Sequence, residues 1–270
     1  MVKTSRLYKL EGDGGCGFFC MLANICHLIY KEDHNVFINW SRNKYDKKGM
    51  NVFDFIFTQN YPEDYTVIGP MRPEMWKPEL AKFFKSYPTN ENTENIEEFN
   101  RRFWSIFSIN DKLQQRLDSL NQIKKNKKTL SVHIRRSDSL SVHYFKPYMN
   151  YDPNNMEFYY NKIKETYEQG DYEKLFVCTE DRFVMDYLKS KFDENILFYQ
   201  DVTRVFFEKI DQNSTLQSIY NQNGEELLLE IMSDVLFASK CDGFLGTPYS
   251  GVSIFIEIFN NNKFESKNYF

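Results

Sequence analysis

The chain has 270 residues, of which 41% are hydrophobic and 17% aromatic, so it can bury a sizeable core, is not disordered and should form about two domains. A net charge of −4 and an isoelectric point near 5.7 argue against broad attraction to nucleic acid, so any anion site must be local. The five cysteines include no Cys-x-x-Cys pair, which argues against a structural metal, and their odd number suggests a reducing compartment. The chain has no apolar run of about 18 residues, and its N-terminal stretch is polar. We therefore predict a cytoplasmic protein without a transmembrane segment.

The first 40 residues are typical of a β-α-β unit. A strand is predicted at 6–10, a glycine-rich turn at 12–17, an apolar helix at 18–30 and a second strand at 35–40. In this arrangement backbone N–H groups can approach a phosphate at the start of the helix. The turn matches Gly-x-Gly-x-x-Gly imperfectly, so its glycines either bind a phosphate or only make a tight turn.

The middle of the chain carries weaker signals, because prolines break residues 50–88 into short pieces. Apolar residues at helical spacing then predict helices at about 96–107 and 111–124. The lysine-rich run 124–128 is predicted to be a solvated linker. It sets the expected boundary between a domain of residues 1–127 and a domain of residues 128–260, with residues 261–270 as a C-terminal tail.

Residues 130–138, Leu-Ser-Val-His-Ile-Arg-Arg-Ser-Asp, carry the densest chemistry. The three aliphatic residues would face one side of a strand, His133 and Arg135 the other side, and Arg136 and Asp138 the following turn. Ligands of open α/β sheets bind outside the carboxyl ends of the strands, and arginines there favour a phosphate or a carboxylate. The alternative is a strand end whose solvated arginines are held by Asp138.

From residue 154 onward, predicted helices and strands alternate. Helices are expected at 154–168, 181–192, 225–240 and 252–259, and strands at 175–178, 196–199 and 243–246. This alternation predicts a parallel, doubly wound sheet. Polar residues follow the strands, among them Asp181 after one and Thr247 and Ser250 after another, where hydroxyls and amides at a helix start suit a diphosphate.

Asp234 lies within or beside the apolar stripe of the predicted helix 225–240. A carboxylate in that position needs a hydrogen-bond donor. The donor could be a protein amide, Arg204, or a guanine base, which offers adjacent N1–H and N2–H groups. Adenine offers no such edge, and uracil has only one N–H.

Together these motifs resemble the GDP-fucose-dependent fucosyltransferases, most of all the α1,6-fucosyltransferases that act on N-glycan cores and on rhizobial nodulation factors. The likeness rests on residues 15–20, 132–138 and 179–181, and on Asp234 followed by residues 246–250, whose order and separations agree over most of the chain. It implies a GT-B fold of two Rossmann-like halves and an inverting, metal-independent transfer. No Asp-x-Asp metal motif occurs in the sequence.

The resemblance also implies roles for individual residues. Arg135 would bind the diphosphate and act in catalysis, and Asp234 would contact guanine. The full set expected at the donor comprises Gly15, Gly17, His133, Arg135, Arg136, Asp138, Asp181, Asp234, Thr247 and Ser250.

The chain departs from the family pattern at several positions. Ser139 replaces a lysine of the family, and His143 stands where the relatives carry a glutamate. We predict His143 as the general base, because its ordinary pKa of about 6.5 is near working pH; the alternative is a loop histidine packed on a neighbouring tyrosine. Cys16 and Cys20 match family cysteines and are expected to be free. We expect no counterpart of the anchor, stem and SH3-like domain of the animal enzymes, so their acceptor and compartment are not carried over.

We therefore expect an α/β, GT-B-like enzyme whose partners are GDP-fucose as donor and a glycan hydroxyl as acceptor, with no metal or other cofactor. Arg135 and Arg136, with amides at a helix start, would offset the charge that builds on the departing diphosphate. The alternatives are a transferase that uses another nucleotide-sugar and a catalytically silent nucleotide-sugar or glycan-binding protein.

Overall fold

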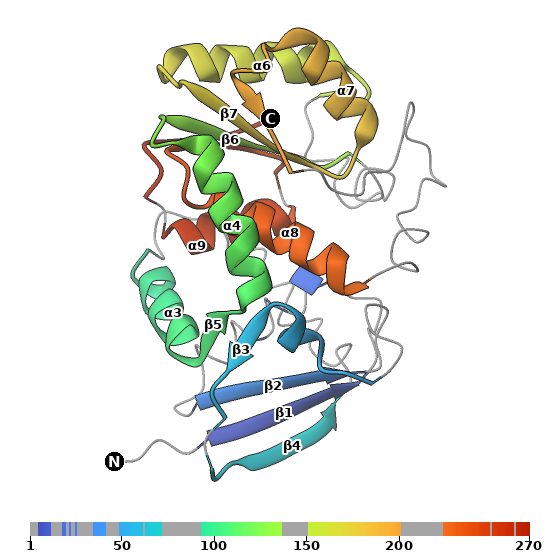
Figure 1. The fold of residues 1–270 in the computed structure, drawn as a ribbon, viewed down its shortest axis with the longest axis vertical. Coiled ribbons are helices and arrows are strands. Elements are labelled where there is room, and N and C mark those ends of the chain that lie inside the picture. The colour runs from blue at the N-terminus through green and yellow to red at the C-terminus, as the bar shows by residue number, and fades with distance from the viewer. Residues whose placement is uncertain are drawn as a thin grey trace. The chain divides into compact units, whose positions relative to one another are not determined.

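The computed structural model describes residues 5–11, 18–19, 22, 25, 35–41, 49–61, 63–71, 93–136, 151–200, 224–248, 250–261 and 263–270. The chain forms two compact units, one of Met1–Gln115 with Asn223–Met232 and one of Arg116–Gln222 with Ser233–Phe270. Helices α4 (Asp111–Lys124) and α8 (Gly224–Ala238), labelled in Figure 1, each contribute residues to both units. None of the helices in these ranges is long and apolar enough to cross a membrane.

The first unit is built on a three-stranded parallel sheet in the order β2 (Asn35–Ser41), β1 (Ser5–Glu11), β4 (Thr66–Met71). β1 and β2 pair along their whole lengths, which confirms the two predicted opening strands. Residues 18, 19, 22 and 25 are helical, in keeping with the helical crossover that parallel strands require. The glycine-rich turn at 12–17 lies outside the described residues.

Side-chain amides bond the backbone groups on the outer edge of β2. Gln59 accepts from Ile38 N and donates to Ile38 O, both at 2.8 Å. Asn51 accepts from Trp40 N and donates to Ile38 O, both at 2.9 Å, and it also caps the short 3₁₀ helix η1 (Val52–Phe55). Ile38 N, Ile38 O and Trp40 N, which a further strand would use, are therefore already hydrogen-bonded.

An antiparallel strand pair and a helix add an aromatic core to the first unit. β3 (Phe57–Gln59) pairs with β5 (Phe107–Ile109), which directly follows α3 (Thr93–Ile106). The rings of Phe103 and Phe107 lie 4.8 Å apart between centroids, and those of Phe57 and Phe103 lie 5.4 Å apart. These short strands were not predicted, and Phe107, expected at the end of a helix, belongs to β5.

The second unit contains a five-stranded parallel sheet in the order β10-β9-β6-β7-β8. The strands are β6 (Thr129–Ile134), β7 (Lys174–Thr179), β8 (Leu197–Phe198), β9 (Gly243–Gly246) and β10 (Ser266–Tyr269). The chain adds β7 and β8 on one side of β6 and then β9 and β10 on the other. The predicted doubly wound sheet is confirmed, and its topological switch point lies between β6 and β9. β10 was not predicted.

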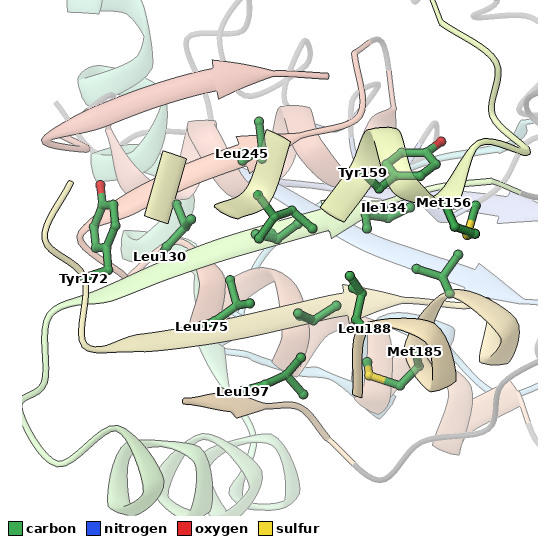
Figure 2. Close-up of a cluster of buried hydrophobic side chains, with 14 residues drawn as sticks. Leu130, Ile134, Met156, Tyr159, Tyr172, Leu175, Met185, Leu188, Leu197 and Leu245 are labelled. Atoms are coloured by element: carbon green, nitrogen blue, oxygen red, sulfur yellow. The ribbon is translucent and has the colours of Figure 1, made fainter. Parts of the chain in front are cut away.

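Helices cover both faces of this sheet, α6 (Met156–Gln169) and α7 (Arg182–Lys191) on one face and α9 (Gly251–Asn260) with the end of α8 on the other (Figure 1). Figure 2 shows Leu130 and Ile134 of β6 in the core under α6 and α7, together with Leu175, Leu188 and Leu245. Burying each such side chain stabilises the fold by about 1.5–3 kcal/mol. The predicted alternation of β6 is therefore observed, because Ser131 faces the other way and donates to Ala238 O at 3.3 Å.

Candidate functional site

The ends of β6 and β9 are joined on either side of the switch point by the side chain of Thr247. Its hydroxyl donates to His133 O at 3.1 Å and accepts from Arg135 N at 2.9 Å, while Thr247 N also donates to His133 O at 3.0 Å. The predicted donor-binding residue Thr247 thus uses its hydroxyl inside the protein. It fixes the backbone from which the side chain of Arg135 begins.

Ser250 occupies the N-cap position of α9, next to this junction, but its hydroxyl does not cap the helix. Other helices have side-chain caps: Asn155 accepts from Phe158 N at the start of α6, and Asp181 accepts from Phe183 N at the start of α7. Ser250 Oγ is buried, and among the described residues it has no hydrogen-bond partner. A buried hydroxyl without a partner beside a helix N-terminus is a favourable place for an anion.

His133, at the end of β6, is buried against α9. Its Nδ1 lies 2.8 Å from Ser253 Oγ, and both side chains are buried. Burial, with a smaller contribution from the charge of Arg135, lowers the pKa of His133 to about 3. The ring is therefore neutral at working pH, so it can hydrogen-bond but does not serve as a proton-transfer group there. Ser253 was not identified from sequence, although it lies one helical turn after Ser250.

Arg136 follows β6 and is completely buried. Its guanidinium donates to three acceptors of the protein, Pro153 O at 3.0 Å, Asn154 Oδ1 at 3.1 Å and Asp181 Oδ2 at 2.7 Å. An arginine used in this way joins the segment before α6 to the start of α7. We therefore assign Arg136 to holding these segments together, in place of the contact with a diphosphate that the sequence predicts.

Asp181 is the buried partner of Arg136. One carboxylate oxygen pairs with Arg136, and the other accepts from Phe183 N at 2.8 Å at the start of α7. Burial raises the pKa of Asp181, and the hydrogen bond and charge of Arg136 oppose that shift. Both oxygens have protein partners, so we also assign Asp181 a structural role in place of the predicted donor contact.

Asp234 lies on α8 at the level where the neighbouring strands end. Its backbone oxygen is 4.0 Å from Sγ of Cys178 in β7, and its carboxylate accepts from Gln200, which follows β8. The sequence left three partners open for the Asp234 carboxylate. One of them, a protein amide, is present as Gln200, whereas Arg204 lies outside the described residues. Gln200 was not identified from sequence, although a polar residue directly after a buried strand is the signal that could have found it.

Other predicted positions lie outside the described residues, namely Gly15, Gly17, Asp138, His143, Ser139, Cys16 and Cys20. Within the described part of the chain, Cys178 and Cys241 are buried and belong to no disulfide. No group of three or more His, Cys, Asp or Glu side chains in that part is placed to hold a metal ion.

The sheets and their switch point define a GT-B-like α/β fold that matches the structures of GT-B fucosyltransferases. No family model matches the sequence, and no curated protein does either.

Among solved structures, the chain is similar to the NodZ α-1,6-fucosyltransferase soaked with GDP-fucose, with a TM-score of 0.55 and 15% identity over 96% of this chain and 93% of that one. For fucosyltransferase NodZ from Bradyrhizobium the TM-score is 0.54, with 15% identity over 95% and 92%. For POFUT1 in complex with GDP-fucose the TM-score is 0.55, with 8% identity over 100% and 98%. At these identities the likeness is one of fold.

Proposed function

We propose that this chain is an inverting glycosyltransferase that moves L-fucose from GDP-fucose to a glycan hydroxyl without a metal ion. The observation that carries the proposal is the buried hydroxyl of Ser250, which has no partner among the described residues at the start of α9. The switch point of a doubly wound sheet is where such folds bind nucleotides. The similarity in fold to fucosyltransferase structures soaked with GDP-fucose or in complex with it favours this donor.

The main chemical difficulty of the reaction is the negative charge that builds on the departing GDP. The acceptor oxygen forms its bond to C1 of fucose as the bond from C1 to the phosphate oxygen breaks, and the acceptor proton passes to a base. Arg135, which is partly exposed, and the N-terminus of α9 with Ser250 are the groups that would offset the charge. His143 remains our candidate for the base, because the buried His133 has a pKa of about 3.

The base of the donor would be recognised by Asp234, whose carboxylate can accept from N1–H and N2–H of guanine together. We expect GDP to bind at least about tenfold more tightly than UDP or ADP, which corresponds to roughly 1.4 kcal/mol. Calorimetry with the three diphosphates measures this preference. Tighter binding of UDP than of GDP would overturn both the role of Asp234 and the choice of donor.

The transfer reaction itself is tested on a glycan array with GDP-fucose, GDP-mannose and UDP-N-acetylglucosamine. The proposal requires turnover with GDP-fucose. Turnover with another donor alone would identify a different glycosyltransferase, and donor binding without turnover across the array would identify a silent binding protein.

The Ser250→Ala variant tests whether the buried hydroxyl of Ser250 binds a phosphate of the donor. Loss of a hydrogen bond to a charged phosphate should weaken GDP binding by about 1.5–3 kcal/mol, roughly tenfold to a hundredfold. The free energy of unfolding should not fall, because the hydroxyl has no described protein partner to lose. The matched control is Asn155→Ala, which removes the side-chain cap that accepts from Phe158 N. It should lower the free energy of unfolding by about 1 kcal/mol and leave GDP affinity unchanged. Unchanged GDP affinity in Ser250→Ala would contradict the anion site.

A further inference from the structure

Both ends of the Gln200 side-chain amide are held by neighbouring residues of α8. Nε2 donates to Oδ1 of Asp234 at 2.5 Å, and Oε1 accepts from Oγ of Ser233 at 2.9 Å. All three side chains are buried, with exposed fractions of 8% for Gln200, 9% for Asp234 and 0% for Ser233. In the opposite orientation the amide oxygen would face the carboxylate, so these contacts allow one orientation of the amide.

We propose that Gln200 is a positioning residue that gives the site its selectivity for guanine by fixing the carboxylate of Asp234. The inference rests on the proposed function, because it takes Asp234 as the residue that meets the base. A carboxylate rotates through a broad torsional range when nothing holds it. The bond from Gln200 restricts that rotation, so the carboxylate is already oriented when the planar edge of a base arrives.

The chemistry of the amide suits this role better than a charged donor would. Lysine or arginine at position 200 would also hold the carboxylate, but its positive charge would offset the negative charge that attracts the two N–H groups of guanine. An amide is neutral and therefore restricts the carboxylate without offsetting its charge. A carboxylate has about four acceptor positions, so one bond at Oδ1 is compatible with a bidentate pair to a base.

Ser233 completes the arrangement because it determines which end of the amide faces Asp234. Without that hydroxyl, Oε1 loses a described partner and the amide can turn. The Ser233→Ala variant should therefore produce a weaker form of the defect expected from Gln200→Leu. It also changes less of the core, so it tests the proposal even if Gln200→Leu fails to fold.

The experiment compares the affinities of GDP, IDP and UDP for the full chain by calorimetry. IDP keeps N1–H but lacks the N2 amino group, so the ratio of GDP to IDP affinity reports the second contact alone. We expect the wild-type protein to prefer GDP over IDP by about tenfold or more. Gln200→Leu should reduce this ratio to within about threefold of unity while UDP affinity stays unchanged, and Ser233→Ala should give an intermediate ratio. Ser239→Ala, which removes a buried hydroxyl directly after α8 that donates to Leu236 O, is the control and should keep the wild-type ratio.

A purely structural role for Gln200 predicts a different outcome, namely equal losses of affinity for all three nucleotides or a lower melting temperature with the ratio kept. Either result would overturn the inference. The Asp234→Asn variant separates it from the proposed function. If the wild type prefers GDP and Asp234→Asn loses the preference while Gln200→Leu and Ser233→Ala keep it, only the role of Gln200 fails. If the wild type has no preference for GDP over IDP and UDP, the donor assignment fails and the inference fails with it.

Discussion

Replacing Asp181 by alanine removes the carboxylate that pairs with Arg136 and leaves the guanidinium inside the protein. Both side chains are fully buried, with 2.7 Å between Arg136 Nη1 and Asp181 Oδ2. Removing one partner of a buried ion pair costs about 3–5 kcal/mol. The same change removes the bond from Phe183 N that begins α7, which adds about 1 kcal/mol. A total of roughly 4–6 kcal/mol lowers the melting temperature by about 10–20 °C in a chain of this size.

Thermal unfolding followed by circular dichroism measures the loss, and calorimetry with GDP at a temperature where the variant is folded measures binding. The control is Asp186→Ala, because Asp186 lies 3.5 Å from Arg182 in an exposed pair and its loss should cost less than about 1 kcal/mol. We expect the Asp181→Ala variant to be much less stable and to bind GDP within about threefold of wild type while folded. Normal stability with lost GDP binding would refute the structural assignment of Arg136 and Asp181.

Three further predictions concern histidine and arginine side chains. The pKa of His133 is about 3 in the folded chain and about 6.5 when unfolded, so its contribution to stability is complete above pH 6.5 and is lost as pH falls towards 3, by about 1.4 kcal/mol per pH unit. In urea unfolding, the free energy of unfolding of His133→Gln should therefore fall less steeply with pH than that of the wild type. Equal pH dependence of the two proteins would contradict this prediction. Arg135→Ala should reduce turnover by roughly a hundredfold or more, about 3 kcal/mol, while the fold stays intact, and Arg135→Lys should restore little; near-normal activity of the alanine variant would exclude the role. His143→Ala should lose most of the rate together with the fall of activity on the acid side of a pKa near 6.5, and a retained pH profile would exclude His143 as the base.

The sequence predicts the second sheet well because its strands are short apolar runs between helices with clear spacing. β6 is the best example: alternation along residues 130–134 places His133 on the α9 side, where the structure has it. The same alternation could have indicated that Arg135 and Arg136 face opposite sides of the sheet. Arg136 continues the even-numbered positions of Leu130 and Ile134, so it turns towards α6 and α7 and is buried there, whereas Arg135 does not. Which carboxylate it would meet depends on contacts distant in sequence.

Elements with weak local signals were not predictable. Residues 266–269, Ser-Lys-Asn-Tyr, have little apolar character, and they form β10 because β9 offers an edge with which they pair. Tertiary contacts hold this strand in place, since Lys267 and Tyr269 both bond to the buried carboxylate of Glu257 on α9. β3 and β5 are only three residues long and pair across about 50 residues, so local propensity does not reveal them.

The amide side chains along β2 also restrict how copies of this protein can associate. Four hydrogen bonds join Gln59 and Asn51 to the backbone of Ile38 and Trp40. A strand from a second molecule could add here only after breaking them, at about 0.5–1.5 kcal/mol each. Exposed strand edges are common starting points for aggregation. Two polar side chains thus protect the first unit against growth of its sheet into fibrils or domain-swapped dimers at this edge.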